Sequence, residues 1–367
     1  MKKTLVILFS LVLCFYLFTS AVAQNQEDGH IFRAKVRQVG LSLSIPGLTN
    51  GAVAKLKKEN FRVWEKIKNG KNGEDRQEQE IINFAIFKDQ PVAMIVAIDS
   101  SESMNPGPQQ TNRGYYGRTG DNKLIRAKVG AKDLIENVFR NTDLGLIAEF
   151  FTETYYNDEG KIANGGIRYF YVNQDWTKNK DALSDGIKNI GDSLGATPIR
   201  QAIYLLAEQF LNEKISGDYL RVMVVVSDGL ESESVGGILG KLSNSDVIKK
   251  LEDNQILVYS VGLYERESLM SSILPGTNTN NILEDAAYAT GGRAFFGGEL
   301  NKLPKIFAEI EDSIRNIVYL SYAPKSDIDG PREIVVEMGS IGNDGKWNKS
   351  NSKNILHRRG YTHKKDE

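Results

Sequence analysis

The sequence predicts an α/β protein: a doubly wound, mostly parallel sheet inserted into a small β-sandwich-like domain made from both chain ends. From about Val92 onward, strand-like apolar runs alternate with helix-like runs, as in a parallel sheet with helices on both faces. Residues 24–90 and 317–367 hold short alternating or apolar runs separated by Gly and Asn turns, which is typical of antiparallel strands. The 367 residues, 41% hydrophobic and 25% charged, suffice for one full domain and a smaller one.

Residues 1–23 have the pattern of a secretory signal peptide. Two lysines precede an apolar core, and Ala21-Val22-Ala23 is the small-x-small pattern that precedes signal-peptidase cleavage. We therefore expect cleavage before Gln24 and no membrane insertion of the mature chain. The alternative is an uncleaved anchor, because residues 4–23 are about long enough to span a bilayer.

Cysteine usage and charge narrow the class of protein further. The one cysteine, Cys14, lies in the predicted leader, so the mature chain can form no disulfide. Export without disulfides is typical of a bacterial envelope or secreted protein, so we expect a secreted, periplasmic or cell-envelope location. The formal net charge of -1 gives no electrostatic footprint for nucleic acid, and no nucleic-acid partner is expected.

The α/β part, residues 91–316, follows the expected alternation in order. Strands are predicted over residues 93–98, 144–151, 167–172, 221–227, 256–263 and 293–297. Helices are predicted over residues 122–139, 198–211, 246–253, 283–289 and 303–317. The first helix carries apolar residues close to helical spacing at Leu124, Ala127, Ala131, Leu134, Ile135 and Val138.

The flanking segments are predicted as the two halves of one β domain, residues 24–90 and 317–367. Strand-like runs occupy residues 36–48, 61–67, 80–87, 318–324, 332–338 and 355–361. The stretch KNGKNGEDRQEQE, residues 68–80, is interpreted as an exposed polar turn because it holds no apolar residue.

Oxygen-bearing side chains follow three of the predicted segments. Asp99, Ser101 and Ser103 come directly after the buried run AMIVAI, and Asp228 ends the run VVVSD. Thr197 precedes Pro198, which suits the first position of the next helix. Open α/β sheets bind ligands at the carboxyl ends of their strands, so these five residues are expected on loops at one edge of the sheet.

The expected donor set consists of two carboxylates and three hydroxyls, with no Cys or His. Hard oxygen ligands in an octahedron suit Mg²⁺ or Mn²⁺, and Mg²⁺ usually keeps several waters and takes one or two carboxylates. Hydroxyls can bind the ion directly while the acids hold its waters, which leaves one position for an incoming carboxylate.

These residues resemble the von Willebrand factor type A (VWA) family. The DxSxS motif of residues 99–103, the Thr197 loop and the strand-ending Asp228 stand in the family's order and look like its metal-ion-dependent adhesion site. The resemblance implies a Rossmann-like fold, bound Mg²⁺ (or Mn²⁺ or Ca²⁺), and a protein partner whose exposed Asp or Glu completes the coordination. The flanks are similar to exported bacterial VWFA-related proteins first grouped from acidobacteria, which implies no particular activity. The long loop 104–122 departs from that pattern and leaves the choice of ligand open.

Two other interpretations of these residues compete with a metal site. Asp and Ser after a strand often only cap the next helix, and the presence of Thr197 and Asp228 favours a metal site over that interpretation. The stretch GDSLG, residues 191–195, matches the serine-hydrolase elbow, but a helical run precedes it and every histidine lies in the flanks. We therefore expect no enzymatic activity.

Two function classes remain after this comparison. The first is an exported, divalent-cation-dependent protein-binding or adhesion module. The second is an envelope scaffold in which the metal is only structural. A coordination position that accepts a partner's carboxylate would distinguish the first from the second.

Overall fold

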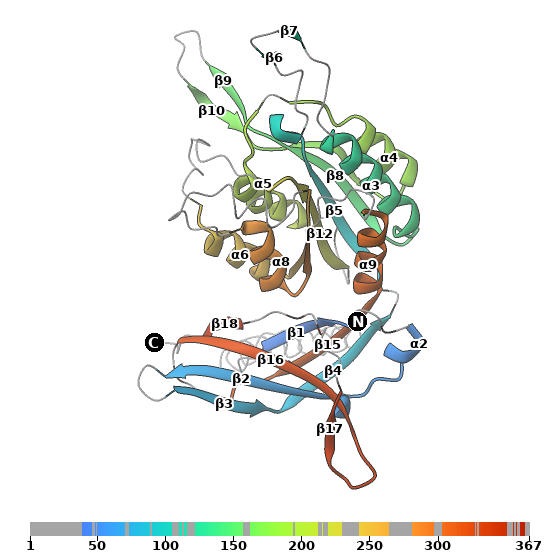
Figure 1. Cartoon of the computed structure of the whole chain (residues 1–367), viewed down its shortest axis with the longest axis vertical. Coiled ribbons are helices and arrows are strands. Elements are labelled where there is room, and N and C mark those ends of the chain that lie inside the picture. Colours follow the sequence, from blue (N-terminus) through green and yellow to red (C-terminus); the bar gives the residue numbers. More distant parts are fainter. Residues whose placement is uncertain are drawn as a thin grey trace, which may run out of the picture.

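The structure is a computed structural model of the chain, in which an α/β unit lies above a β unit in the view of Figure 1. The residues that it describes are 39–45, 48, 50–69, 73–88, 90–104, 110–111, 114–115, 122–156, 162–193, 195–211, 215, 219–229, 242–263, 281–296, 303–326, 328, 330–350, 355, 357 and 360–363. The predicted leader and most of the loop 104–122 lie outside these residues. Among the described residues, no helix has the length and apolar character needed to cross a membrane.

The α/β unit is built on a six-stranded sheet of order β11-β8-β5-β12-β13-β14. Strands β8, β5, β12, β13 and β14 pair in parallel, and β11 is antiparallel to β8. Their bounds are β5 Val92–Asp99, β8 Leu144–Phe150, β11 Tyr171–Thr177, β12 Leu220–Ser227, β13 Ile256–Gly262 and β14 Arg293–Phe296. Every residue of β5, β8 and β13 is buried, as in strands covered on both faces. The structure confirms the predicted doubly wound, mostly parallel sheet.

Helices cover both faces of this sheet (Figure 1). Their bounds are α3 Lys123–Asn137, α4 Lys180–Lys188, α5 Ile199–Leu206, α6 Asn244–Asp253, α8 Ile282–Thr290 and α9 Leu303–Arg315. Helices α3, α4 and α9 share one core with the sheet, and α5, α6 and α8 share the other. Side chains of β5 alternate between the two cores, with Val96 in the first and Ile95 in the second. The apolar positions predicted for the first helix are all buried.

Asn or Ser side chains cap the starts of α3, α4, α6 and α8. The Asn122 side chain accepts a hydrogen bond from Ile125 N at 2.9 Å and caps α3. Ser243 and Asp246 form a capping box at the start of α6. Gly291 adopts φ 88° and ends α8 in the left-handed conformation that glycine favours.

The prediction of one strand over residues 167–172 is wrong. The segment divides into the end of β10 (Ile162–Arg168) and the start of β11. Strand β10 pairs with β9 (Glu153–Tyr156) in a separate hairpin, whereas β11 pairs with β8 in the main sheet. The intervening Tyr169 is buried, and Phe170 packs against a core of the sheet. The apolar run is therefore continuous in sequence and does not indicate where the pairing changes from β9 to β8.

The β unit is made from strands of both chain ends, as the predicted fold class requires. One sheet has the order β1-β15-β4, and the other has the order β17-β16-β2-β3 with β18 beside β16. The bounds are β1 Val39–Ser44, β2 Phe61–Asn69, β3 Gly73–Gln79, β4 Ile81–Lys88, β15 Asn316–Tyr322, β16 Gly330–Ile341, β17 Trp347–Lys349 and β18 Gly360–His363. Leu41, Val63, Leu320 and Ile334 belong to one buried core that the two sheets share. The exact domain boundaries at residues 90 and 316 stay a prediction.

The interpretation of residues 68–80 as a polar turn is also wrong. Gly73–Gln79 form β3, which pairs antiparallel with β2 from Val63↔Gln79 to Asn69↔Gly73. The strand lies at the edge of its sheet, where charged side chains are common, and its sequence therefore lacks apolar alternation. The Arg76 guanidinium lies 4.2 Å from the ring centroid of Trp64 on β2, which supplies packing that an apolar side chain would otherwise give.

The two units join at a buried arginine. Helix α9 ends at Arg315 and β15 begins at the next residue, so no loop separates them. The Arg315 guanidinium forms an ion pair with Asp143 and donates to Val138 O at 2.7 Å and Gln90 O at 3.4 Å. Asp143 also accepts a hydrogen bond from Val92 N at 2.9 Å. The entry into β5 and the exit from α9 are therefore fixed to one another.

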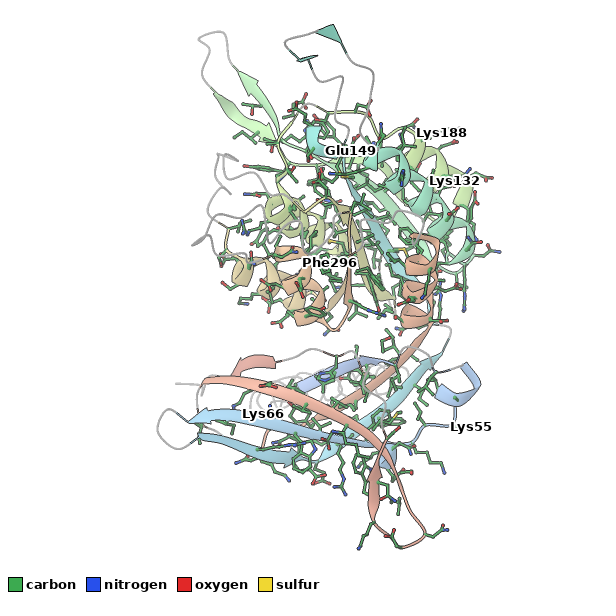
Figure 2. The ribbon with its side chains drawn as sticks, viewed as in Figure 1. Lys55, Lys66, Lys132, Glu149, Lys188 and Phe296 are labelled. Atoms are coloured by element: carbon green, nitrogen blue, oxygen red, sulfur yellow. The ribbon has the colours of Figure 1, made fainter. Side chains whose placement is uncertain are left out.

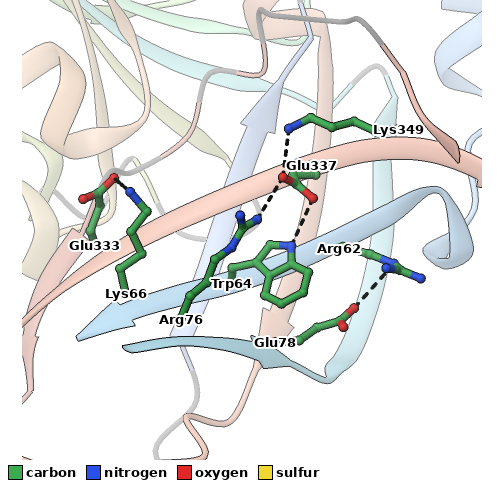
Figure 3. A network of polar contacts seen from close by, with 8 residues as sticks. All are labelled: Arg62, Trp64, Lys66, Arg76, Glu78, Glu333, Glu337 and Lys349. Atoms are coloured by element: carbon green, nitrogen blue, oxygen red, sulfur yellow. Dashed lines mark hydrogen bonds and ion pairs between the residues drawn. The ribbon is translucent and has the colours of Figure 1, made fainter. Parts of the chain in front are cut away.

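A charged network covers the outer face of the second sheet of the β unit, with Glu337 at its centre (Figure 3). Its carboxylate accepts hydrogen bonds from Trp64 Nε1 at 3.1 Å, Arg76 Nη2 at 2.9 Å and Lys349 Nζ at 2.8 Å. Partial burial raises the pKa of Glu337, but the hydrogen bonds and charges of Lys349 and Arg76 outweigh it, so this pKa lies below its usual value.

We expect Glu337→Gln to lower the free energy of unfolding by about 1–2 kcal/mol at pH 7. Because folding lowers the pKa of Glu337, its stabilisation is present above the unfolded-state pKa of about 4.3 and is lost as the pH falls through the folded value. Urea denaturation should therefore show a larger difference between the wild type and Glu337→Gln at pH 7 than at pH 3. The control is Glu333→Gln, whose half-exposed ion pair with Lys66 should matter little. A difference that is equal at both pH values would contradict this account.

Candidate metal centre

The first site residue, Asp99, ends β5 at the carboxyl edge of the sheet. Its Oδ1 accepts a hydrogen bond from Ser101 N at 2.9 Å, which turns the chain at once after the strand. Its Oδ2 accepts a hydrogen bond from Ser227 Oγ at 2.6 Å, on the last residue of the neighbouring β12. The carboxylate is thus fixed by residues of two adjacent strand ends and is fully buried.

The three predicted hydroxyls connect the two acids. Thr197 Oγ1 donates to Ser101 Oγ at 2.8 Å, and the hydroxyls of Ser101 and Ser103 lie 3.3 Å apart. Ser103 Oγ donates to Asp228 Oδ1 at 3.1 Å. The structure therefore brings together all five residues predicted from the sequence, from three separate loops. Asp99, Ser101, Thr197 and Asp228 are each at most 3% exposed.

The loop of residues 191–197, which carries Thr197, is held by contacts that do not involve Thr197 itself. Gly191 N donates to Glu149 Oε2 at 3.2 Å, and Glu149 lies at the upper end of the sheet in Figure 2. Ser193 N donates to Ser100 O at 3.1 Å, which joins this loop to the DxSxS segment. A Cβ on Gly195 would lie 2.3 Å from Thr152 O, so only glycine allows this close approach. These contacts place Thr197 beside the DxSxS segment.

The electrostatics of the site favour a bound cation. Burial raises the pKa of Asp99 to about 7, the hydrogen bonds from Ser101 and Ser227 lower it, and the charge of Asp228 raises it. Asp228 is 1% exposed, and its Oδ2 forms an ion pair with Lys123 Nζ at 2.8 Å. A buried carboxylate is stabilised by nearby positive charge, which Lys123 supplies to Asp228 and which a bound cation would supply to Asp99.

Sequence reasoning missed three residues of this site. Ser227 directly precedes Asp228 within the run VVVSD, so a hydroxyl at this strand end could be seen in the sequence. Glu149 was also visible as a lone acid inside a buried strand, which requires hydrogen-bond partners. Lys123 had no such signal, because it follows the long 104–122 loop and its distance from Asp228 depends on the fold.

The donor set fits a hard divalent cation. It offers two carboxylates and three hydroxyls, all oxygen, within one hydrogen-bonded chain. This composition suits Mg²⁺ or Mn²⁺, which prefer oxygen ligands and keep water in their shell. Ser193, at the centre of the GDSLG stretch, follows helix α4 and its Oγ accepts a hydrogen bond from Gly195 N at 2.9 Å, so it shapes this loop.

A doubly wound sheet with an oxygen-rich site where its central strands end defines a class of α/β ligand-binding domains. Within this class, the family model for the von Willebrand factor type A domain matches residues 94–309. The match covers more than half of the 367 residues, and the chain belongs to this family. No curated protein matches the chain.

Several solved structures are similar to the chain. Proximal thread matrix protein 1 from the mussel byssus, in a structure with a zinc-occupied MIDAS motif, is 14% identical with a TM-score of 0.43, over 62% of this chain and 48% of that one. An aerotolerance-related membrane protein from Bacteroides fragilis is 16% identical with a TM-score of 0.41, over 60% and 98%. Conserved hypothetical protein BatB from Bacteroides thetaiotaomicron is 17% identical with a TM-score of 0.41, over 60% and 98%. The chain spans about half the length of the mussel protein that it matches.

Proposed function

We propose that this chain is an exported, divalent-cation-dependent protein-binding module. In this proposal Asp99, Ser101, Ser103, Thr197 and Asp228 hold Mg²⁺ or a similar divalent cation, and an Asp or Glu of the protein partner completes the coordination. The observation that carries the proposal is the continuous chain of hydrogen bonds that links these five oxygen-bearing side chains around two buried carboxylates. Membership of the von Willebrand factor type A family supports it, because domains of this family commonly bind protein partners.

The charges of the site explain why a carboxylate is the expected ligand. If the hydroxyls of Ser101, Ser103 and Thr197 bind the ion directly while Asp99 and Asp228 hold its waters, the ion's direct ligands are neutral and leave its charge for a partner's carboxylate. Mg²⁺ in such a site keeps exchangeable waters. An incoming carboxylate can replace one of these waters and adds a charge-assisted contact in a largely buried place.

Location and reaction class are part of the same proposal. The leader of residues 1–23, its Ala-Val-Ala cleavage pattern and the absence of cysteine after Cys14 support export to the envelope or the medium. We propose no enzymatic role, because the site offers ligands for an ion and a binding position for a partner.

We expect titration calorimetry with Mg²⁺ or Mn²⁺ to detect one site in the wild type. Asp228→Ala or Asp99→Ala should weaken this binding by about 100-fold or more, because either change removes half of the anionic charge of the site. Asp192→Ala is the matched control, because it removes an exposed carboxylate from the 191–197 loop that is not one of the five site residues. Equal affinity of the wild type and Asp228→Ala would refute the assignment.

A second measurement distinguishes a binding module from a scaffold with a structural metal. Mn²⁺ bound to the site should enhance water proton relaxation, because it keeps exchangeable water. Acetate, as a carboxylate probe, should then reduce the enhancement by replacing that water. Relaxation that does not respond to acetate would favour the scaffold alternative.

A further inference from the structure

Lys123 occupies an unusual place beside the metal centre. It is the first residue of α3, where the partial positive charge of a helix N-terminus disfavours a cation. Its Nζ nevertheless reaches Asp228 Oδ2 at 2.8 Å. The Lys123 side chain is 31% exposed whereas the Asp228 side chain is 1% exposed, so the ammonium enters the site from the solvent side.

We propose that Lys123 is a tethered cation that neutralises Asp228 in the metal-free protein and competes with the divalent cation for this carboxylate. The inference rests on the proposed function, because it concerns the same site. Lys123 thereby sets how much divalent cation is needed before the site can accept a partner.

The geometry of Asp228 supports competition. Its Oδ1 already accepts the Ser103 hydroxyl at 3.1 Å, and Lys123 takes Oδ2, so both oxygens are in use. A hydrated cation between the carboxylates needs Asp228 as a ligand or as an acceptor for its water, and it repels the ammonium. The long, partly exposed lysine side chain can leave Oδ2 for solvent, while the buried carboxylate cannot move with it.

The proposal predicts two opposite effects of Lys123→Met. Removing the ammonium should raise the affinity for Mg²⁺ about tenfold, because the ion no longer displaces a competing charge. It should also lower the melting temperature in chelator, because Asp228 is then buried without its cation. Added Mg²⁺ should therefore raise the melting temperature of Lys123→Met by more than that of the wild type.

Two controls separate this effect from a change in net charge or side-chain packing. Lys132→Met removes a cation from the same helix, at an exposed position on the outer side of the α/β unit, and should leave Mg²⁺ affinity unchanged (Figure 2). Lys123→Arg keeps the charge and should keep the wild-type affinity for Mg²⁺.

The outcomes of this experiment distinguish the inference from the proposed function. Tighter Mg²⁺ binding by Lys123→Met, with Lys132→Met unchanged, supports the competition. Equal or weaker binding by Lys123→Met, while the wild type binds Mg²⁺ and Asp228→Ala does not, overturns the inference and leaves the proposed function intact. If neither the wild type nor Lys123→Met binds Mg²⁺ or Mn²⁺, both fail.

Discussion

Deletion of residues 317–367 is expected to leave the N-terminal strands open to proteolysis. Strand β1 pairs with β15, β4 pairs with β15, and β2 pairs with β16, so the deletion removes a neighbour from each of these strands. Strands β2 and β3 alone form a two-stranded hairpin, which is marginally stable in water. Limited trypsin digestion should therefore cleave β2 rapidly at Arg62 or Lys66.

The deletion has a matched control and a clear contrary result. A chain that ends at residue 363 keeps every described strand and should resist trypsin like the full chain. The deleted chain should still bind Mg²⁺, because the metal centre and its six-stranded sheet lie between residues 92 and 296. If residues 39–88 stay as protected in the deletion as in the full chain, the two flanks do not form one domain, and the boundaries proposed at residues 90 and 316 are wrong.

Arg332→Met is expected to lower the free energy of unfolding by about 3–5 kcal/mol. The Arg332 and Glu65 side chains are both 0% exposed, and Nη1 donates to Glu65 Oε2 at 2.9 Å. Nη2 donates to Ser326 O at 2.9 Å and Ile328 O at 2.6 Å. Methionine fills much of the volume but leaves a buried carboxylate without its cation. Urea denaturation followed by tryptophan fluorescence measures the change, since Trp64 and Trp347 lie in the β unit.

The double variant Arg332→Met with Glu65→Leu tests the cause. Replacing both members of a buried ion pair by apolar side chains is often neutral or stabilising, so the double variant should regain most of the stability that the single variant loses. A single variant within about 1 kcal/mol of the wild type would show that Glu65 is well satisfied without Arg332.

The α/β unit could be predicted largely from the sequence because its strands and helices carry strong apolar patterns. The eight buried residues of β5 and the helical spacing in α3 each identify one element without ambiguity. Strand β3 could not be found in this way, because GEDRQEQ has no apolar residue and is stabilised by its ladder to β2. The division of residues 167–172 depends on which strand each half pairs with, and a local sequence pattern does not determine the pairing partner.

The proximity of the five site residues was predictable, because each follows a recognisable strand end or precedes a recognisable helix. What the sequence could not supply is the contact between loops. Lys123 meets Asp228 across 105 positions of the chain, and Glu149 holds the glycine at position 191 rather than any predicted ligand. Such residues act through tertiary neighbours, and a motif search that looks for ligands passes over them.

The chain passes between the two units twice, and this has a mechanical consequence. Strand β4 leads into β5 beside the place where α9 leads into β15, and Asn316 pairs with Lys88 at that point. A single connection would let the two units rotate about it, but two connections that are paired by hydrogen bonds resist such rotation. Asp99 lies at the far end of β5, about 25 Å away for eight extended residues. A pull on a ligand held there would run along the β5 backbone toward β4, and the parallel ladders of β5 with β8 and β12 would resist any sliding of β5 in shear, with their hydrogen bonds loaded together instead of one after another.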